Sequence, residues 1–187
     1  SYEGPVAGWR SYGGDPGGTR YSPLTQITPR NVRLLEEAWV YRTGEDYTGT
    51  RFEGSAAFEA TPILVHDTLY FSTPSTRVIA LDPETGQERW VFDPEVDLSY
   101  GRSEFTSRGV SAWTDPENPE VWTIFVPTND ARLIAIDGAT GQRRTAFGDN
   151  GEVDLTRGVN LKEKGDYTVT SPPAILDNLV IVGSAIG

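Results

Sequence analysis

An internal repeat constrains the fold more than any other feature of this sequence. The segment 78–87, VIALDPETGQ, realigns with the segment 133–142, LIAIDGATGQ, at an offset of 55 residues. A partial third copy follows at twice that offset, and its matching pairs are Thr61-Pro62 with Ser171-Pro172 and Asp67-x-Leu69 with Asp177-x-Leu179. Such a chain builds one supersecondary unit several times and stacks the copies against one another.

Each copy predicts short strands separated by tight turns. The first copy predicts strands at 61–65, 69–72, 77–81 and 88–92, with the turn chemistry of Asp82-Pro83-Glu84-Thr85-Gly86 before the last of them. Four strands in a repeat of about 40–50 residues are typical of a propeller blade. We therefore expect an all-β chain, a β-propeller of four-stranded antiparallel blades that is incomplete here. A parallel β-helix is the alternative, although its repeats are much shorter.

The expected organisation is a single domain fragment over residues 1–187, with about two and a half blades. It comprises an N-terminal segment (1–42), a first blade (59–92), a second blade (108–147) and the start of a third blade (170–187). The N-terminal segment predicts a short helix beginning at Thr28-Pro29 and an outer strand at 37–41 that would close the ring. We expect the chain to be a piece of a longer protein.

One spacing predicts how neighbouring blades contact each other. Ala80-x-Asp82-x-x-x-Gly86-x-x-x-Trp90 places an indole at the outer edge of the first blade, where it could pack flat between blades. The second copy has Thr145 in place of the tryptophan. The alternative is a plain β-hairpin with a tryptophan in its core.

Composition excludes several classes of function. The chain has 16 Lys plus Arg against 27 Asp plus Glu, a net charge of −11, which argues against binding nucleic acid or an anionic membrane. It has no Cys, which excludes a disulfide scaffold, a thiolate zinc site and a Cys nucleophile. Its single His, His66, lies in a predicted turn, where we expect it to be solvated rather than catalytic. The glycine-rich segment 13–18 follows no strand–helix pattern, which argues against a phosphate cradle.

Three polar residues lie immediately before the expected innermost strand of each unit: Glu59, Arg108 and Thr170. The innermost strands of a propeller line its central channel, so these side chains should converge at one end of that channel. A guanidinium fork suits carboxylates, and a carboxylate can bind a hard cation. The set therefore suits a small, flat, polyanionic ligand. The alternative is a Glu–Arg salt bridge that links blades.

A set of motifs extends over nearly the whole chain. They are Trp9-x-x-x-Gly13, Arg20-Tyr21-Ser22-Pro23-Leu24-x-x-Ile27-Thr28-x-x-Asn31-Val32-x-x-Leu35, Phe58-Glu59-Ala60-Thr61-Pro62-Ile63, Thr106-Ser107-Arg108-Gly109-Val110-Ser111, Asn129-Asp130-Ala131-Arg132-Leu133-Ile134-Ala135 and Tyr167-Thr168-Val169-Thr170-Ser171-Pro172-Pro173. With these motifs the chain resembles the quinoprotein dehydrogenases that use pyrroloquinoline quinone (PQQ). The resemblance is stronger to the glucose, quinate and polyol dehydrogenases than to the methanol enzymes.

The resemblance implies an eight-bladed propeller that holds PQQ and a divalent cation, usually Ca²⁺, or a lanthanide ion, in its channel. It implies oxidation of an alcohol, sugar or polyol in the bacterial periplasm and electron transfer to a quinone or a cytochrome. By position, Glu59, Arg108 and Thr170 match family residues that contact PQQ. The catalytic residues and a metal ligand are expected after Gly187, and any membrane association would come from parts outside this sequence.

Two departures from the family leave the substrate class open. Arg102-Ser103 replace the adjacent cysteines of the alcohol-oxidising members, and Glu104 replaces a histidine of the membrane glucose enzymes. A non-catalytic propeller that serves as a scaffold for protein partners is the alternative to an enzyme. In either case we expect the rest of the propeller, or another chain, to cover the open blade edges. We expect residues 1–187 alone to be inactive.

Overall fold

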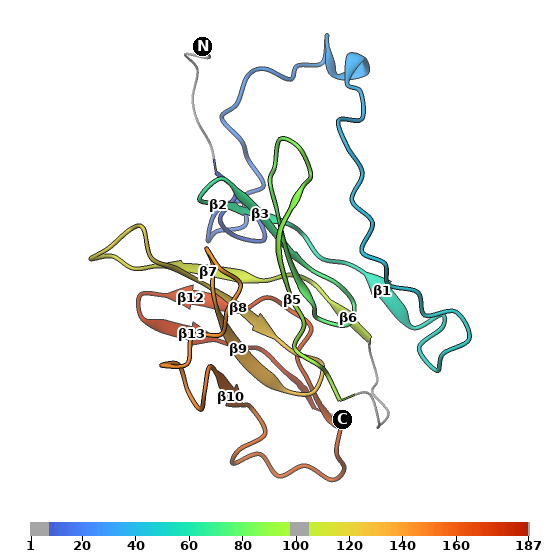
Figure 1. Cartoon of the computed structure of the whole chain (residues 1–187), viewed down its shortest axis with the longest axis vertical. Coiled ribbons are helices and arrows are strands. Elements are labelled where there is room, and N and C mark those ends of the chain that lie inside the picture. The colour runs from blue at the N-terminus through green and yellow to red at the C-terminus, as the bar shows by residue number, and fades with distance from the viewer. Residues whose placement is uncertain (1–7, 98–104, 187) are drawn as a thin grey trace.

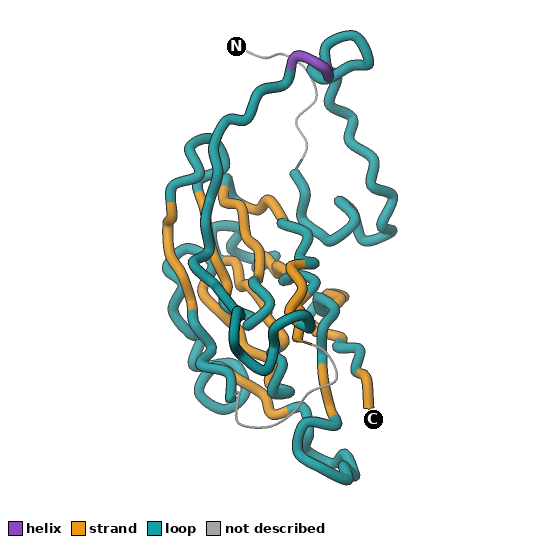
Figure 2. Tube along the Cα trace, turned by 90° about the vertical axis from the view of Figure 1, so that its right-hand side faces the viewer, coloured by secondary structure: helices purple, strands orange, loops and turns teal. Residues whose placement is uncertain are grey.

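The computed structural model describes residues 8–97 and 105–186, and nearly all regular structure in them is β (Figure 1). In this part of the chain the helical structure is one 3-10 turn, η1 (Val32–Leu34). That turn lies on a loop that extends away from the sheets (Figure 2). No helix among the described residues has the length and apolarity needed to cross a membrane. The all-β prediction is confirmed.

The first blade is an antiparallel sheet in the order β2-β3-β4-β5, as predicted. Its strands are β2 (Ile63–Val65), β3 (Thr68–Ser72), β4 (Val78–Leu81) and β5 (Glu88–Phe92). The hairpin at His66-Asp67 has positive φ at both residues, 47° and 51°, which suits a two-residue turn. The next hairpin is held by Asp82, whose Oδ1 accepts hydrogen bonds from the backbone N–H groups of Glu84 (3.1 Å) and Thr85 (2.9 Å).

The second blade is also four-stranded and antiparallel, but its fourth strand comes later than predicted. The strands are β7 (Ser111–Thr114), β8 (Trp122–Pro127), β9 (Arg132–Asp137) and β10 (Glu152–Asp154). Instead of a strand before residue 147, the chain makes a single bridge between Arg143 and Ile136 and then turns. The second blade therefore extends past residue 147, the end predicted for it.

The missing indole explains this difference between the two blades. In the first blade, Trp90 anchors β5 to the second blade, because its Nε1 donates to Gly138 O (3.0 Å) and its ring packs on Gly141. Thr145 cannot make that contact for the second blade. The chain turns there instead, and Phe147 packs edge-on against Phe125, with 5.3 Å between ring centroids.

The third copy begins with the hairpin β12 (Ala174–Leu176) and β13 (Leu179–Ile181). Its turn, Asp177-Asn178, is structurally equivalent to His66-Asp67, so the offset is 111 residues and not the 110 inferred from the sequence match. A shift of one residue exchanges the two faces of a strand. As a result, Val180 and Val182 pack on the second blade, in the role that Leu69 and Phe71 have in the first.

The largest part of the core lies between the first two blades. Ile63, Tyr70, Ile124 and Ile134 are all fully buried in it. A second apolar layer joins the second blade to β12 and β13. Burying both faces of the middle sheet explains why β8 and β9 consist of nearly continuous apolar residues rather than an alternating pattern.

The segment 37–41 forms no strand, contrary to the prediction, yet it lies where a neighbouring blade would lie. The Trp39 indole packs on Gly86 and donates to Pro83 O (3.2 Å), as Trp90 does on the second blade. Tyr41 donates to Glu88 Oε2 (2.7 Å). Without a hydrogen-bonded partner strand, the backbone of this segment is extended but unpaired. Closure of the ring through it stays a prediction.

The helical turn also begins later than predicted. The residue that precedes η1 is Asn31, not Thr28. The Asn31 side chain makes no capping bond to the helix and instead accepts from the backbone N–H of Thr28 (2.6 Å). A 3-10 helix of three residues leaves fewer N–H groups to satisfy than a full α-helix does. The turn at residues 28–31 is therefore sufficient to begin it without a side-chain cap.

Candidate functional site

The structure brings the three predicted site residues into direct contact. The Arg108 Nε lies 3.0 Å from Glu59 Oε2, and the Arg108 Nη1 donates to Thr170 Oγ1. The prediction that these side chains converge is therefore confirmed. The alternative, an ion pair that links blades, describes the same contact, since Glu59 precedes the first blade and Arg108 the second.

Backbone pairing places the three residues side by side. The strands β1 (Ala56–Phe58) and β6 (Phe105–Ser107) form a parallel ladder that ends directly before the site. Beyond it, the Thr61 N–H donates to Arg108 O (3.2 Å) and the Arg108 N–H donates to Thr170 O (2.7 Å). No local pattern in the sequence predicts this parallel ladder, because its paired residues, such as Ala56 and Phe105, do not lie at the 55-residue offset of the repeat.

Buried hydroxyl groups hold the ladder in position. The Ser107 and Ser72 hydroxyls share a hydrogen bond of 2.7 Å, which ties β6 to the end of β3 in the first blade. Thr106 Oγ1 donates to Ala57 O (2.8 Å). Both Ser107 and Thr106 are buried. Since Arg108 follows directly, its backbone is fixed by contacts that do not involve its side chain.

The side chains of the site remain accessible to a ligand. The exposed fractions are 35% for the Arg108 side chain and 43% for Glu59. An ion pair this exposed contributes only about 0–1 kcal/mol to stability, so stability alone does not account for the arrangement. The guanidinium fork and the hydroxyl donor fit a planar polycarboxylate, and the Glu59 carboxylate, which is paired with Arg108, can also accept from a ring N–H or bind a cation.

Arg108 also lines a cavity of about 550 Å³, a size typical of small-molecule sites. The other walls come from Ser111 and Ala112, from the segment 171–175 and from the N-terminal loop 10–18. This loop is the part of the cavity that the sequence analysis missed. Its glycines follow no strand–helix pattern, and no local pattern shows which strand edge such a loop will reach.

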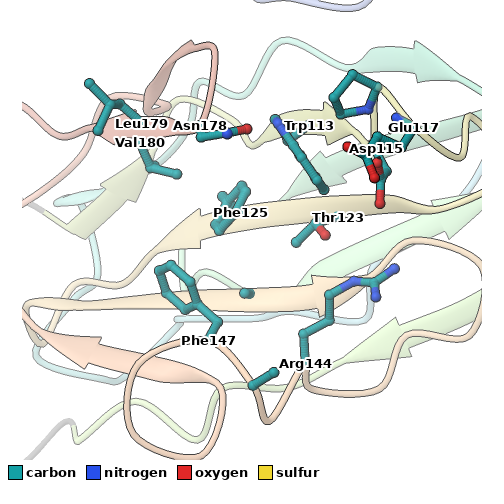
Figure 3. Close-up of a pocket in the computed structure, with 13 residues that line it drawn as sticks. Trp113, Asp115, Glu117, Thr123, Phe125, Arg144, Phe147, Asn178, Leu179 and Val180 are labelled. Carbon is teal, nitrogen blue, oxygen red and sulfur yellow. Dashed lines mark hydrogen bonds between the residues drawn. The ribbon is translucent and has the colours of Figure 1, made fainter.

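A second cavity, of about 520 Å³, lies between the second blade and the third hairpin (Figure 3). Figure 3 shows Phe125 and Phe147 on one side of the space and Val180 on the other. Its polar lining residues are Asp115, Glu117, Thr123, Asn178 and Arg144. Arg144 is paired with Asp137 (2.9 Å). This is an apolar space between blades, and its polar groups do not converge on a ligand as those at Arg108 do.

The remaining candidate residues are placed as follows. His66 is not solvated as predicted: its ring stacks on Trp122 at 4.2 Å, and its Nε2 is buried with no hydrogen-bond partner in the described part of the chain. Arg102, Ser103 and Glu104 lie outside the described residues. Within 8–97 and 105–186, no three His, Cys, Asp or Glu side chains are grouped as metal ligands. A cation at Glu59 would need ligands from elsewhere, and the predicted ligand after Gly187 stays a prediction.

Fold and site together define a class of protein: a β-propeller that carries a polar ligand site where its innermost strands begin. Residues 9–187 match the family model described as "PQQ: Glucose/ethanol/alcohol dehydrogenase, beta-propeller domain". The chain belongs to this family of PQQ-dependent quinoprotein dehydrogenases.

Named relatives agree with this assignment. The quinoprotein glucose dehydrogenase of Gluconobacter oxydans is 38% identical over 194 residues, which cover 97% of this chain and 24% of that protein. The glycerol dehydrogenase large subunit of the same organism is 35% identical, with 97% and 25% covered. The structure of quinohemoprotein alcohol dehydrogenase from Comamonas testosteroni superposes with a TM-score of 0.75 at 31% identity, covering 95% of this chain and 23% of that one. The chain thus spans about a quarter of the length of these relatives.

Proposed function

We propose that the whole protein is a PQQ-dependent dehydrogenase that oxidises an alcohol, sugar or polyol and passes the electrons to a quinone or a cytochrome. Family membership supports the reaction class, and the relatives named above act on glucose, glycerol and alcohols according to their names. A periplasmic location belongs to the same proposal. It rests on the family resemblance alone.

The observation that carries the proposal is the contact of Glu59, Arg108 and Thr170 at the start of the innermost strands. Arg108 would donate to a carboxylate or quinone oxygen of PQQ, Thr170 to a carboxylate, and Glu59 would lie in the same plane beside the cation. When bound, PQQ supplies the two-electron acceptor. The residues of this chain orient it, because the backbone of Arg108 is fixed on both sides by Thr61 and Thr170.

Binding of PQQ to the full-length protein tests the proposal. Loss of a charge-assisted hydrogen bond costs roughly 1.5–3 kcal/mol, so Arg108→Ala should weaken PQQ binding by about 10- to 100-fold in the presence of Ca²⁺. The matched control is Arg30→Ala, which removes an exposed arginine from the N-terminal segment (1–42) outside the loop 10–18. This variant should bind PQQ as the wild type does. Thr170→Val tests the second donor.

Two results would contradict the proposal. One is a wild-type protein that does not bind PQQ with or without Ca²⁺. The other is an Arg108→Ala variant that binds PQQ with unchanged affinity while its circular dichroism and unfolding match the wild type. Weakened binding by Arg108→Ala together with wild-type binding by Arg30→Ala supports it.

A further inference from the structure

The N-terminal loop is attached to the channel edge of the first blade. Trp9 forms an antiparallel bridge with Leu64, and the Leu64 N–H donates to Trp9 O (2.7 Å). The strand β2, which contains Leu64, is the first strand of its sheet. One edge of β2 pairs with β3, and Trp9 bridges the opposite edge. The loop that follows Trp9 is therefore held on the side of the blade from which Arg108 also reaches the cavity.

The loop is compact and ordered rather than a loose tail. The Arg20 N–H donates to Gly13 O (2.8 Å), which closes the loop on itself. Gly13 lies so close to Gly18 that a Cβ at position 13 would be 2.3 Å from the Gly18 Cα, so only glycine fits there. Asp15 accepts hydrogen bonds from the side chain and backbone of Thr19, and these bonds lower the pKa of Asp15.

Arg10 lines the same cavity as Arg108. Among the described residues, the Arg10 guanidinium has no hydrogen-bond or ion-pair partner. Asp15, the carboxylate that shares this wall, is engaged with Thr19 inside its own loop. The lining thus carries two guanidinium groups against one carboxylate, an excess of positive charge that favours an anionic occupant.

We propose that the N-terminal loop 9–18 is a wall of the cofactor cavity and that Arg10 is a second cationic contact for a carboxylate of the cofactor. The proposal rests on the proposed function, because it takes PQQ as the ligand. Arg108 holds one edge of this flat polycarboxylate and Arg10 attracts it from the side of the loop. Arg10 is a binding residue in this arrangement.

Equilibrium titration of PQQ into the full-length protein, followed by quenching of tryptophan fluorescence, tests the role of Arg10. Since an exposed ion pair contributes up to about 1 kcal/mol, Arg10→Ala should weaken binding about two- to fivefold, and Arg10→Glu more than Arg10→Ala. Arg10→Lys keeps the charge and should restore most of the affinity. Arg33→Ala, which removes an exposed arginine from the turn η1, outside the cavity, is the control.

Salt separates an electrostatic role of Arg10 from a structural one. The difference in affinity between wild type and Arg10→Ala should shrink as NaCl rises from 0.02 M to about 0.5 M, because salt screens exposed charges. Equal affinities of wild type, Arg10→Ala and Arg10→Glu overturn the inference. So does a loss that Arg10→Lys fails to restore and that salt leaves unchanged.

The two proposals fail in different ways. If Arg108→Ala weakens PQQ binding while Arg10→Glu binds like the wild type, the inference about the loop is wrong and the proposed function stands. If the wild type binds no PQQ, the proposed function fails, and the inference about Arg10 fails with it.

Discussion

Gly138 is the position where a single methyl group should do the most damage to the contact between the blades. A Cβ built there lies 1.9 Å from Nε1 and 2.1 Å from Cδ1 of the Trp122 indole. The Gly138 carbonyl also accepts hydrogen bonds from Tyr70 Oη (2.9 Å) and Trp90 Nε1 (3.0 Å), both on the first blade. In the first blade, Pro83 is the residue equivalent to Gly138, and Asp67 is equivalent to Trp122. A side chain at position 83 is tolerated because no indole lies next to it at position 67.

The expected cost of Gly138→Ala follows from these contacts. The indole must move away from the new methyl group, and overpacking of this kind costs about 1–3 kcal/mol. The same movement breaks the hydrogen bond from Trp122 Nε1 to Tyr70 Oη (3.0 Å), worth about 1 kcal/mol. Replacing glycine restricts the unfolded chain, which returns about 0.4–1 kcal/mol. We expect a net loss of about 2–3 kcal/mol in the free energy of unfolding.

Urea unfolding followed by tryptophan fluorescence measures this loss. Gly183→Ala is the matched control, because a Cβ at Gly183 meets no atom within 4 Å and its φ is not in the left-handed region. For a slope near 3 kcal/mol/M, the midpoint of Gly138→Ala should fall by roughly 1 M while that of Gly183→Ala stays within a few tenths. Equal midpoints for the two variants would refute the packing argument.

Three further predictions concern blade contacts and the Asp82 turn. Trp39→Ala should lower the free energy of unfolding by about 2–3 kcal/mol. Trp39→Phe keeps the packing on Gly86 but loses the hydrogen bond to Pro83 O, so it should lower that free energy by about 1 kcal/mol. Equal losses for the two variants in urea unfolding would contradict this prediction. Hydrogen bonding from Arg89, then from Thr85, lowers the pKa of Asp82 from 3.8 to about 2. The stability that Asp82 adds is therefore present above pH 4 and is lost as the pH falls through 2. The difference in melting temperature between wild type and Asp82→Asn should vanish over that range. A difference that stays constant would contradict this prediction. Residues 1–187 expressed alone should self-associate in sedimentation, because Leu179 is 62% exposed and Ile181 is 50% exposed on the outer face of the third hairpin. The double variant Leu179→Ser with Ile181→Ser should shift the fragment toward monomer. A monomeric wild-type fragment would contradict the prediction.

Much of the first blade could be predicted because its determinants are local. The strands of the first blade and the turn of Asp82 follow from alternating burial, turn residues and hydrogen bonds between near neighbours. The second blade shows the limit of this reasoning. Its repeat motif is intact up to Gly141, but one replacement, Thr145, removes the contact with the next blade, and the fourth strand moves to 152–154.

The candidate site divides in the same way. Repetition of the innermost strand was enough to predict that Glu59, Arg108 and Thr170 meet, because equivalent positions in stacked blades face one channel. The parallel ladder of β1 and β6 and the approach of Arg10 to the cavity had no signal of that kind. The residues that they bring together do not lie at the 55-residue offset of the repeat.

The sequence by itself determined the repeating unit, the all-β class and the three polar residues that share one end of the blades. Only the tertiary structure decided the one-residue shift of the third hairpin, the stacking of His66 on Trp122 and the loop that walls the cavity beside Arg108. The physical reason is the range of the interactions. Turn chemistry and strand alternation act within about ten residues along the chain, whereas packing between blades selects partners by the shape of the space that distant segments must fill together.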